Sequence, residues 1–229
     1  MKIATIVICM IALVLAAIAY HFYNTNKQTE TELNLKISKL EQQKTALENE
    51  LEIKIGEISK EKEEQIERLK NAYNELVTDM EKEIEDGKIQ ITQLADRLSV
   101  SMVDRILFPS GEVEIMPEGL KVLERVGKVL KNTQNKIIRV EGHTDNVAIH
   151  SNLQKEFPTN WELSTARATN VVRFLQENVG IEAVRLQAIG MSEYHPVADN
   201  KTAAGRSQNR RIEIILLPEY GSPSPLPAK

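Results

Sequence analysis

The sequence contains one cysteine, Cys9, and few aromatic residues, which make up only 4% of the 229 residues. One cysteine cannot form an intrachain disulfide or a zinc site built from cysteines, so a disulfide-rich secreted scaffold is excluded. Basic residues are not in excess either, because the formal net charge is -4. The composition therefore does not indicate a nucleic-acid-binding protein.

Acidic side chains are absent from an apolar run at the amino terminus, Ile3 to Tyr20. Its length is close to the roughly 20 residues that cross a bilayer as a helix. Lys2 precedes the run and aromatic residues follow it, as expected at the two membrane interfaces. We therefore expect residues 1–23 to be a transmembrane anchor. The alternative is a cleaved signal peptide, because Ala17-Ile18-Ala19 has the small-x-small form of a cleavage site.

Proline is absent from residues 28–98, and the only glycines there are Gly56 and Gly87. Apolar residues recur at alternating steps of three and four, which is typical of a coiled-coil seam. They are Leu33, Ile37, Leu40, Leu47, Leu51 and Ile58, then Leu69, Tyr73, Leu76 and Met80, then Ile84, Ile91, Leu94 and Leu98. We predict a coiled-coil rod over residues 28–98, roughly 100 Å long if straight, that forms a parallel homodimer. The alternative is a single solvated helix.

After residue 98 the pattern changes to short apolar runs that alternate with helical periodicity. We expect strands at 105–108, 136–141, 185–190 and 210–217, and helices at 117–131, 161–178 and 202–209. This alternation predicts an α/β sandwich over residues 99–217, with helices on one face of a mixed sheet. Asn160 is the expected cap of the second helix, and Gly180 the left-handed residue that ends it. Residues 218–229 contain four prolines and should be disordered.

Three motifs stand at the ends of these elements: Gly142-His143-Thr144-Asp145-Asn146, Asn160-Trp161-Glu162-Leu163-Ser164 and Gly205-Arg206-Ser207-Gln208-Asn209-Arg210-Arg211. In this order and spacing they resemble the OmpA/MotB C-terminal family of peptidoglycan-binding domains, over roughly residues 103–217. The insert of residues 147–159 between the first two motifs is similar to that of the MotB-like branch. The resemblance implies an OmpA-like α+β sandwich.

The resemblance also implies the ligand, which is the diaminopimelate of the peptidoglycan stem peptide. The matching Asp145 would bind its ammonium, the matching Arg167 its carboxylate, and Arg210 would support the site. Thr144, Asn160 and Leu163 would belong to the same pocket. The residue types suit a zwitterion, because a planar guanidinium donates two parallel hydrogen bonds to a carboxylate. The alternative from the residues alone is an internal salt bridge between Asp145 and Arg167.

Enzymatic activity is not expected, because the sequence has no HExxH, GxSxG or paired-cysteine motif. His143, Asp145 and His150 are candidate metal ligands. His143 and Asp145 would face alike on an extended segment, but the sequence places no third ligand convincingly beside them. We therefore expect no cofactor and no metal. His143 is expected to make a structural hydrogen bond, and Trp161 to pack at the start of its helix.

A MotB-like stator subunit of a flagellar-type motor is the alternative function. Such a subunit carries an aspartate in its membrane helix, and residues 3–20 have no acidic residue. A scaffold within a larger envelope or motor complex is a third possibility. We expect an inner-membrane, single-pass protein with a periplasmic C-terminal domain, or an exported protein if the amino-terminal segment is cleaved. Its partners would be peptidoglycan and the membrane.

Overall fold

The computed structural model describes residues 2–94, 97–133 and 136–218. The side chains of residues 2–9 and 12 lie outside this description, as does the predicted disordered tail beyond residue 218. The chain divides into two compact units, residues 1–61 and 62–229. The second unit contains all of the strands among the described residues.

Helix α1 runs from Lys2 to Asp79. Proline is absent, and ion pairs one turn apart, such as Lys54 with Glu50 at 2.8 Å, support the exposed surface of the helix. The apolar seam up to Ile58 is exposed in the single chain. In the part of the chain that the structure describes, no helix combines the length and apolarity that a membrane span requires.

The helix predicted to continue to residue 98 ends instead at Asp79. The chain then forms a short helix and two strands: α2 (Glu81–Glu85), β1 (Ile89–Leu94) and β2 (Arg97–Val103). Gly87 adopts a left-handed conformation, with φ of 65°, between α2 and β1. The last turns of α1 belong to the second unit, since Leu69, Leu76 and Met80 are buried in its core.

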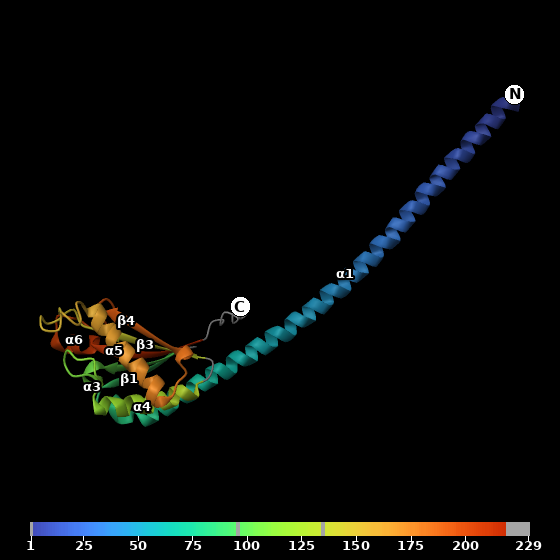
Figure 1. The fold of residues 1–229 in the computed structure, drawn as a ribbon. Coiled ribbons are helices and arrows are strands. Elements are labelled where there is room, and N and C mark those ends of the chain that lie inside the picture. The colour runs from blue at the N-terminus through green and yellow to red at the C-terminus, as the bar shows by residue number, and fades with distance from the viewer. Residues whose placement is uncertain (1, 95–96, 134–135, 219–229) are drawn as a thin grey trace. The chain divides into compact units, whose positions relative to one another are not determined.

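The sheet has five strands in the order β1-β2-β5-β3-β4 (Figure 1). Its remaining strands are β3 (Lys136–His143), β4 (Leu186–Ser192) and β5 (Arg211–Pro218). Only β3 and β4 pair in parallel, and the other three pairs are antiparallel. The prediction of a mixed sheet is confirmed, and the three strands predicted after residue 135 are confirmed with it.

The helices of the second unit are α3 (Asp104–Leu107), α4 (Pro117–Asn132), α5 (Asn160–Phe174) and α6 (Ala203–Asn209). Figure 1 shows α4 and α5 lying across the sheet. Alternate residues of β2, β3 and β5 are buried in the core, for example Val100, Val140 and Ile214. The opposite face of these strands carries polar side chains such as Glu213 and apolar ones such as Ile215.

Some local predictions are wrong. Residues 104–107 form the single helical turn α3, not a strand. The N-cap of α5 is Thr159, whose side chain and that of Glu162 form a capping box, and Asn160 is the first helical residue. Helix α5 continues as a π-helical turn (Leu175–Val179), and Gly180 then adopts the predicted left-handed conformation, with φ of 78°.

Candidate functional site

A pocket of about 630 Å³ lies where α3, the segment after β3, the start of α5 and the start of β5 meet. The six residues that the sequence singled out all line it, although they come from three separate segments. They are Thr144, Asp145, Asn160, Leu163, Arg167 and Arg210. The fold therefore brings the three motifs together at one place.

Asp145 follows β3 directly, and its side chain is held in place from two sides. Its Oδ1 accepts a hydrogen bond from the backbone N–H of Val147 at 3.0 Å, an Asx-turn contact. Its Oδ2 accepts from Nη1 of Arg210 at 2.5 Å. Only 6% of Asp145 is exposed. This carboxylate is thus fixed in orientation at the wall of the pocket.

Arg167 lies on α5 and is also buried, with 3% exposed. Its Nε donates to the carbonyl oxygen of Glu112 at 2.9 Å, and its Nη1 donates to Oδ2 of Asp104 at 3.1 Å. The guanidinium carbon lies 5.0 Å from the centre of the Phe108 ring, a cation–π distance. Nη2 makes no hydrogen bond to any residue that the structure describes. This nitrogen remains able to donate to a ligand.

Asp104 is a pocket residue that sequence reasoning missed. It accepts the hydrogen bond from Arg167, and its Oδ2 lies 3.6 Å from Nε of Arg210. Since Arg210 also bonds Asp145, the four groups form a row in the order Arg167, Asp104, Arg210, Asp145. Asp145 is therefore paired with Arg210, and Arg167 with Asp104, so Asp145 and Arg167 do not pair with each other.

Burial shifts the pKa of two groups in this row, Asp104 and Arg167. It raises the pKa of the Asp104 carboxyl above its ordinary value, although Arg167 and Arg210 act in the opposite direction. Burial also lowers the pKa of the Arg167 guanidinium, against the effect of Asp104. Two carboxylates and two guanidiniums thus share one largely desolvated pocket.

Asn160 shapes the pocket from the start of α5. Its Nδ2 donates to the carbonyl oxygens of Asp145 and Val147, at 3.3 and 3.2 Å, and to Oε2 of Glu193 at 2.5 Å. These bonds tie the segment after β3 to α5 and to the loop after β4. Thr144 is 4% exposed and its N–H donates to the carbonyl oxygen of Ser192 at 2.9 Å.

Two further residues differ from expectation. His143 was predicted to make a structural hydrogen bond, but neither ring nitrogen has a hydrogen-bond partner among the described residues. Trp161 was predicted to pack at the helix start. It is 46% exposed and stacks on Tyr194, with ring centroids 5.6 Å apart.

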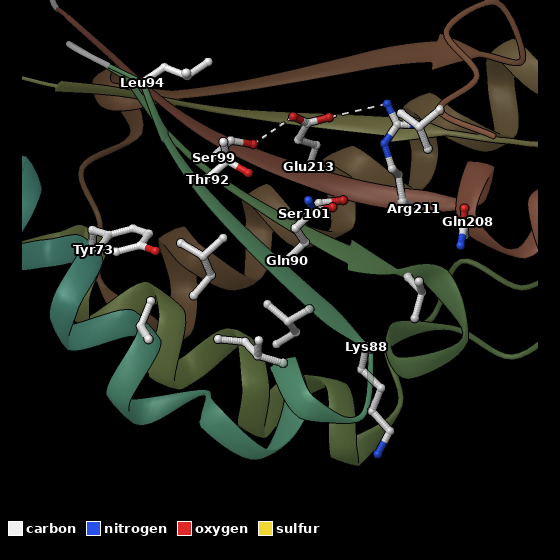
Figure 2. A pocket seen from close by; sticks show the side chains of 17 residues that line it. Tyr73, Lys88, Gln90, Thr92, Leu94, Ser99, Ser101, Gln208, Arg211 and Glu213 are labelled. Carbon is white, nitrogen blue, oxygen red and sulfur yellow. Dashed lines mark hydrogen bonds and ion pairs between the residues drawn. The ribbon is translucent and has the colours of Figure 1, made fainter.

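A second pocket, of about 730 Å³, lies at the β1 edge of the sheet and is lined by residues of the strands and by Tyr73 of α1 (Figure 2). It contains none of the six predicted residues. Figure 2 shows Glu213 of β5 there, with Ser99 on one side and Arg211 on the other. The charged row of the first pocket is absent from this one, so we take the first as the candidate binding site.

Comparison with known proteins gives consistent matches to one family. The OmpA family model matches residues 107–210. Motility protein B of Bacillus subtilis (strain 168) is 37% identical over 131 residues, which are 57% of this chain and 49% of that protein. The chain spans about half the length of the curated relatives it matches first.

Solved structures give the same result. A MotB-like protein from Desulfovibrio vulgaris aligns with a TM-score of 0.62 and 30% identity, covering 71% of this chain and 99% of that one. The cell wall anchor of the T6SS from Pseudomonas aeruginosa aligns with a TM-score of 0.57 and 33% identity, covering 63% and 97%. Both alignments take in nearly all of the compared structure.

Proposed function

Because this chain belongs to the OmpA family, we propose that its second unit binds peptidoglycan and anchors a membrane-tethered protein to the cell wall. OmpA-like and MotB-like domains are non-enzymatic, as the sequence predicted for this chain. The relatives whose names describe a role include a cell wall anchor and a motility protein. Anchoring by noncovalent binding fits both kinds of relative.

The observation that carries the proposal is the placement of opposite charges in one pocket. The side-chain end of diaminopimelate carries an ammonium and a carboxylate on the same carbon. Asp145 supports binding of the ammonium, since its carboxylate is fixed and already accepts from a cation. Arg167 supports binding of the carboxylate through Nη2, its one nitrogen without a hydrogen bond among the described residues.

The contacts indicate modest affinity for each domain. Hydrogen bonds to charged groups contribute about 1.5–3 kcal/mol each, and part of this is offset because Arg210 and Asp104 already pair with the same side chains. A dimer on a polymeric wall would bind more firmly, because the second domain binds at high effective concentration. The proposed homodimer through α1 would supply this second domain.

The tether is the second part of the proposal. The apolar residues 1–23 would hold the chain in the inner membrane as a single-pass anchor, with the domain in the periplasm. Cleavage of this segment as a signal peptide would instead release an exported protein. In either case the peptidoglycan-binding domain would lie outside the cytoplasm, where its ligand is found.

A stator subunit of a flagellar-type motor is the second candidate, because Motility protein B is among the relatives. The absence of Asp and Glu from residues 3–20 argues against ion conduction by this chain. Motility of a deletion strain separates the two functions. A wall anchor without a motor role predicts normal swimming speed, and paralysed cells would favour the stator.

Sedimentation with purified sacculi tests the proposed site. Wild type should pellet, whereas Asp145→Ala and Arg167→Ala should lose at least tenfold in apparent affinity, which corresponds to about 1.4 kcal/mol. Asp199→Ala and Arg173→Ala are matched controls, because Asp199 is exposed and Arg173 is an exposed arginine of the same helix as Arg167. Both controls should pellet like wild type.

Arg167 is buried, so its truncation could also unfold the domain. Circular dichroism of each variant checks this, and competition on the wild type avoids the problem. Free meso-diaminopimelate should release wild-type protein from sacculi, and equal concentrations of cadaverine, a diamine that has no carboxylate, should release less. Equal pelleting of all variants, with no release by diaminopimelate, would remove the site assignment.

A further inference from the structure

Three side chains of ligating type meet on the polar face of the sheet, away from the charged row. Glu141 and His143 are two residues apart on β3, so their side chains emerge on the same face. Glu213 lies on the neighbouring strand β5 and is the direct cross-strand partner of Glu141. The candidate ligand atoms of these three residues lie within 4.8 Å of one another.

His143 is buried without a hydrogen bond. Its side chain is 2% exposed, and both ring nitrogens lack a hydrogen-bond partner among the residues that the structure describes. Its Nε2 points between the two glutamates, 3.6 Å from Oε2 of Glu141 and 3.9 Å from Oε2 of Glu213. Leaving a buried polar atom unsatisfied costs about 1–3 kcal/mol, and a metal ion bound between Nε2 and the two carboxylates would satisfy this atom.

The two glutamates lie directly opposite each other, and a cation shared by both would reduce their repulsion beyond what Arg139 and Arg211 already supply. Like charges directly opposite each other on adjacent strands are destabilising. One imidazole nitrogen with two carboxylate oxygens is a donor set that suits Zn²⁺, which is often held by three protein ligands and one open position. We propose that Glu141, His143 and Glu213 form a Zn²⁺ site that fastens β3 to β5.

The surrounding contacts orient the ligands. Ser99 donates to Oε1 of Glu213 at 2.7 Å, as Figure 2 shows, and Arg139 Nη1 lies 3.8 Å from Oε1 of Glu141. Both contacts engage Oε1 and leave each Oε2 directed toward His143, which is the role that outer contacts play around metal ligands. The two ligand oxygens are thereby aimed at one point.

Two further side chains border the cluster. Arg211 Nη2 lies 3.4 Å from Oε2 of Glu213, so zinc competes with this cation for the carboxylate (Figure 2). The exposed His195 ring stands edge-on to His143, with centroids 6.4 Å apart, and is not one of the three clustered ligands. The site thus differs from the grouping of His143, Asp145 and His150 considered from the sequence.

Metal uptake by the purified full chain tests the site. After removal of metals with EDTA, equilibrium dialysis against ZnCl₂ should load one zinc per chain, and zinc should raise the thermal midpoint of the sheet domain. Glu213→Gln should weaken binding by about tenfold or more. This side chain is 24% exposed, so the variant is expected to fold. His143→Gln should lose binding as well.

Controls exclude other zinc-binding groups. Cys9→Ser and His150→Ala should load like wild type, since neither residue belongs to the cluster. Asp145→Ala should also keep its zinc, which separates this site from the proposed wall-binding pocket. No uptake by the wild type, or uptake that Glu213→Gln leaves unchanged, would overturn the proposal.

Discussion

At the scale of single residues, Asp104 holds the two arginines of the pocket in place. It is 6% exposed and within ion-pair distance of both Arg167 and Arg210. Removing one partner of a buried ion pair leaves the other charge desolvated and unpaired, which is more damaging than removing both. The position of Arg167 therefore depends on this carboxylate.

Asp104→Asn should lower the free energy of unfolding by about 3 kcal/mol, because Arg167 loses its buried counter-charge. It should also weaken pelleting with sacculi, since the ion pairs with Asp104 no longer hold Arg167 and Arg210 in position at the pocket. Urea unfolding measures the first effect. Asp199→Asn, the same change at an exposed residue, should alter stability by less than about 0.5 kcal/mol. Equal stability of the two variants would contradict this account.

The motifs predicted Asp145, Arg167 and Arg210 as residues of one binding site, and all three line the same pocket. Asp104 could not be predicted, because no motif surrounds it and its pairing with Arg167 spans 63 positions in the chain. The grouping of His143 with Glu213 could not be predicted for the same reason, because the two residues are far apart in the sequence. Contacts of this kind depend on strand order, which the sequence pattern does not specify.

At the scale of elements, α5 lies unusually close to β3. A Cβ atom at Gly142 would stand 2.1 Å from the carbonyl oxygen of Ser164, and one at Gly190 would stand 2.1 Å from Oγ1 of Thr165. Both contacts are far below van der Waals distance. The absence of side chains at these two positions lets the helix that carries Arg167 approach the strand that precedes Asp145.

Gly142→Ala should therefore destabilise the domain by about 2 kcal/mol or more, because backbone must shift to admit the methyl group. Thermal unfolding followed by circular dichroism measures the loss. Gly56→Ala is the matched control, since nothing lies within 4 Å of its added Cβ. Alanine is the better helix former, so this control should leave the domain unchanged and favour α1 by about 0.5–1 kcal/mol. A neutral Gly142→Ala would refute the close approach.

Arg125 of α4 joins the end of α1 to α2. It donates to the carbonyl oxygen of Asp79 at 2.8 Å and pairs with Glu83. Burial tends to raise the pKa of Glu83, but the hydrogen bond and charge of Arg125 outweigh it, so the pKa lies below its ordinary 4.5. A depressed carboxyl pKa stabilises the fold above about pH 4.5 and loses this effect as the pH falls through the folded-state value.

Glu83→Gln should thus cost about 0.5 kcal/mol at pH 7, a small figure because Arg125 is 38% exposed and screened by solvent. The difference from wild type should vanish in acid, below the folded-state pKa of Glu83. Urea unfolding at a series of pH values records both limits. Glu124→Gln, which removes only an exposed pair with Lys128, should show little difference at either end. A constant gap for Glu83→Gln across the series would rule out the ion pair as its cause.

Elements with strong periodicity were predictable. Helix α4 begins at the predicted Pro117. The first residues of β3, β4 and β5 lie within two residues of the predicted first residues. Residues 81–98 were not, because Ile84, Ile91, Leu94 and Leu98 also fit helical spacing. Strand pairing determines the structure of this segment, because β2 pairs with β5 and β1 pairs with β2.

At the scale of the whole molecule, the first unit has an unpartnered apolar seam. Leu40, Leu47 and Leu51 are 56%, 68% and 58% exposed in the single chain. Apolar side chains repeated at steps of three and four become buried when two helices supercoil. The proposed parallel homodimer would cover this seam. The sequence predicted the helix up to Asp79, but the predicted continuation of the rod to residue 98 was wrong.

Leu40→Glu with Leu47→Glu should therefore convert a dimer to a monomer, since buried charge on the seam opposes association. Sedimentation equilibrium of the purified chain gives the mass. Leu35→Glu with Ile53→Glu changes equally exposed residues that lie off the seam, and this control should remain dimeric. A wild type that is monomeric at micromolar concentration would exclude the coiled coil.

The pairing of Arg210 with Asp145 has a consequence for what the protein can discriminate. An ammonium that binds Asp145 competes with the Arg210 guanidinium for the carboxylate. If Arg210 is displaced, it needs another anion. The carboxylate of a zwitterion can pair with Arg210 as well as with Arg167, whereas an alkylamine has no anion and leaves Arg210 with Asp104 alone. Weaker binding of lysine-like side chains would follow from this competition with Arg210, without any steric barrier at the mouth of the pocket.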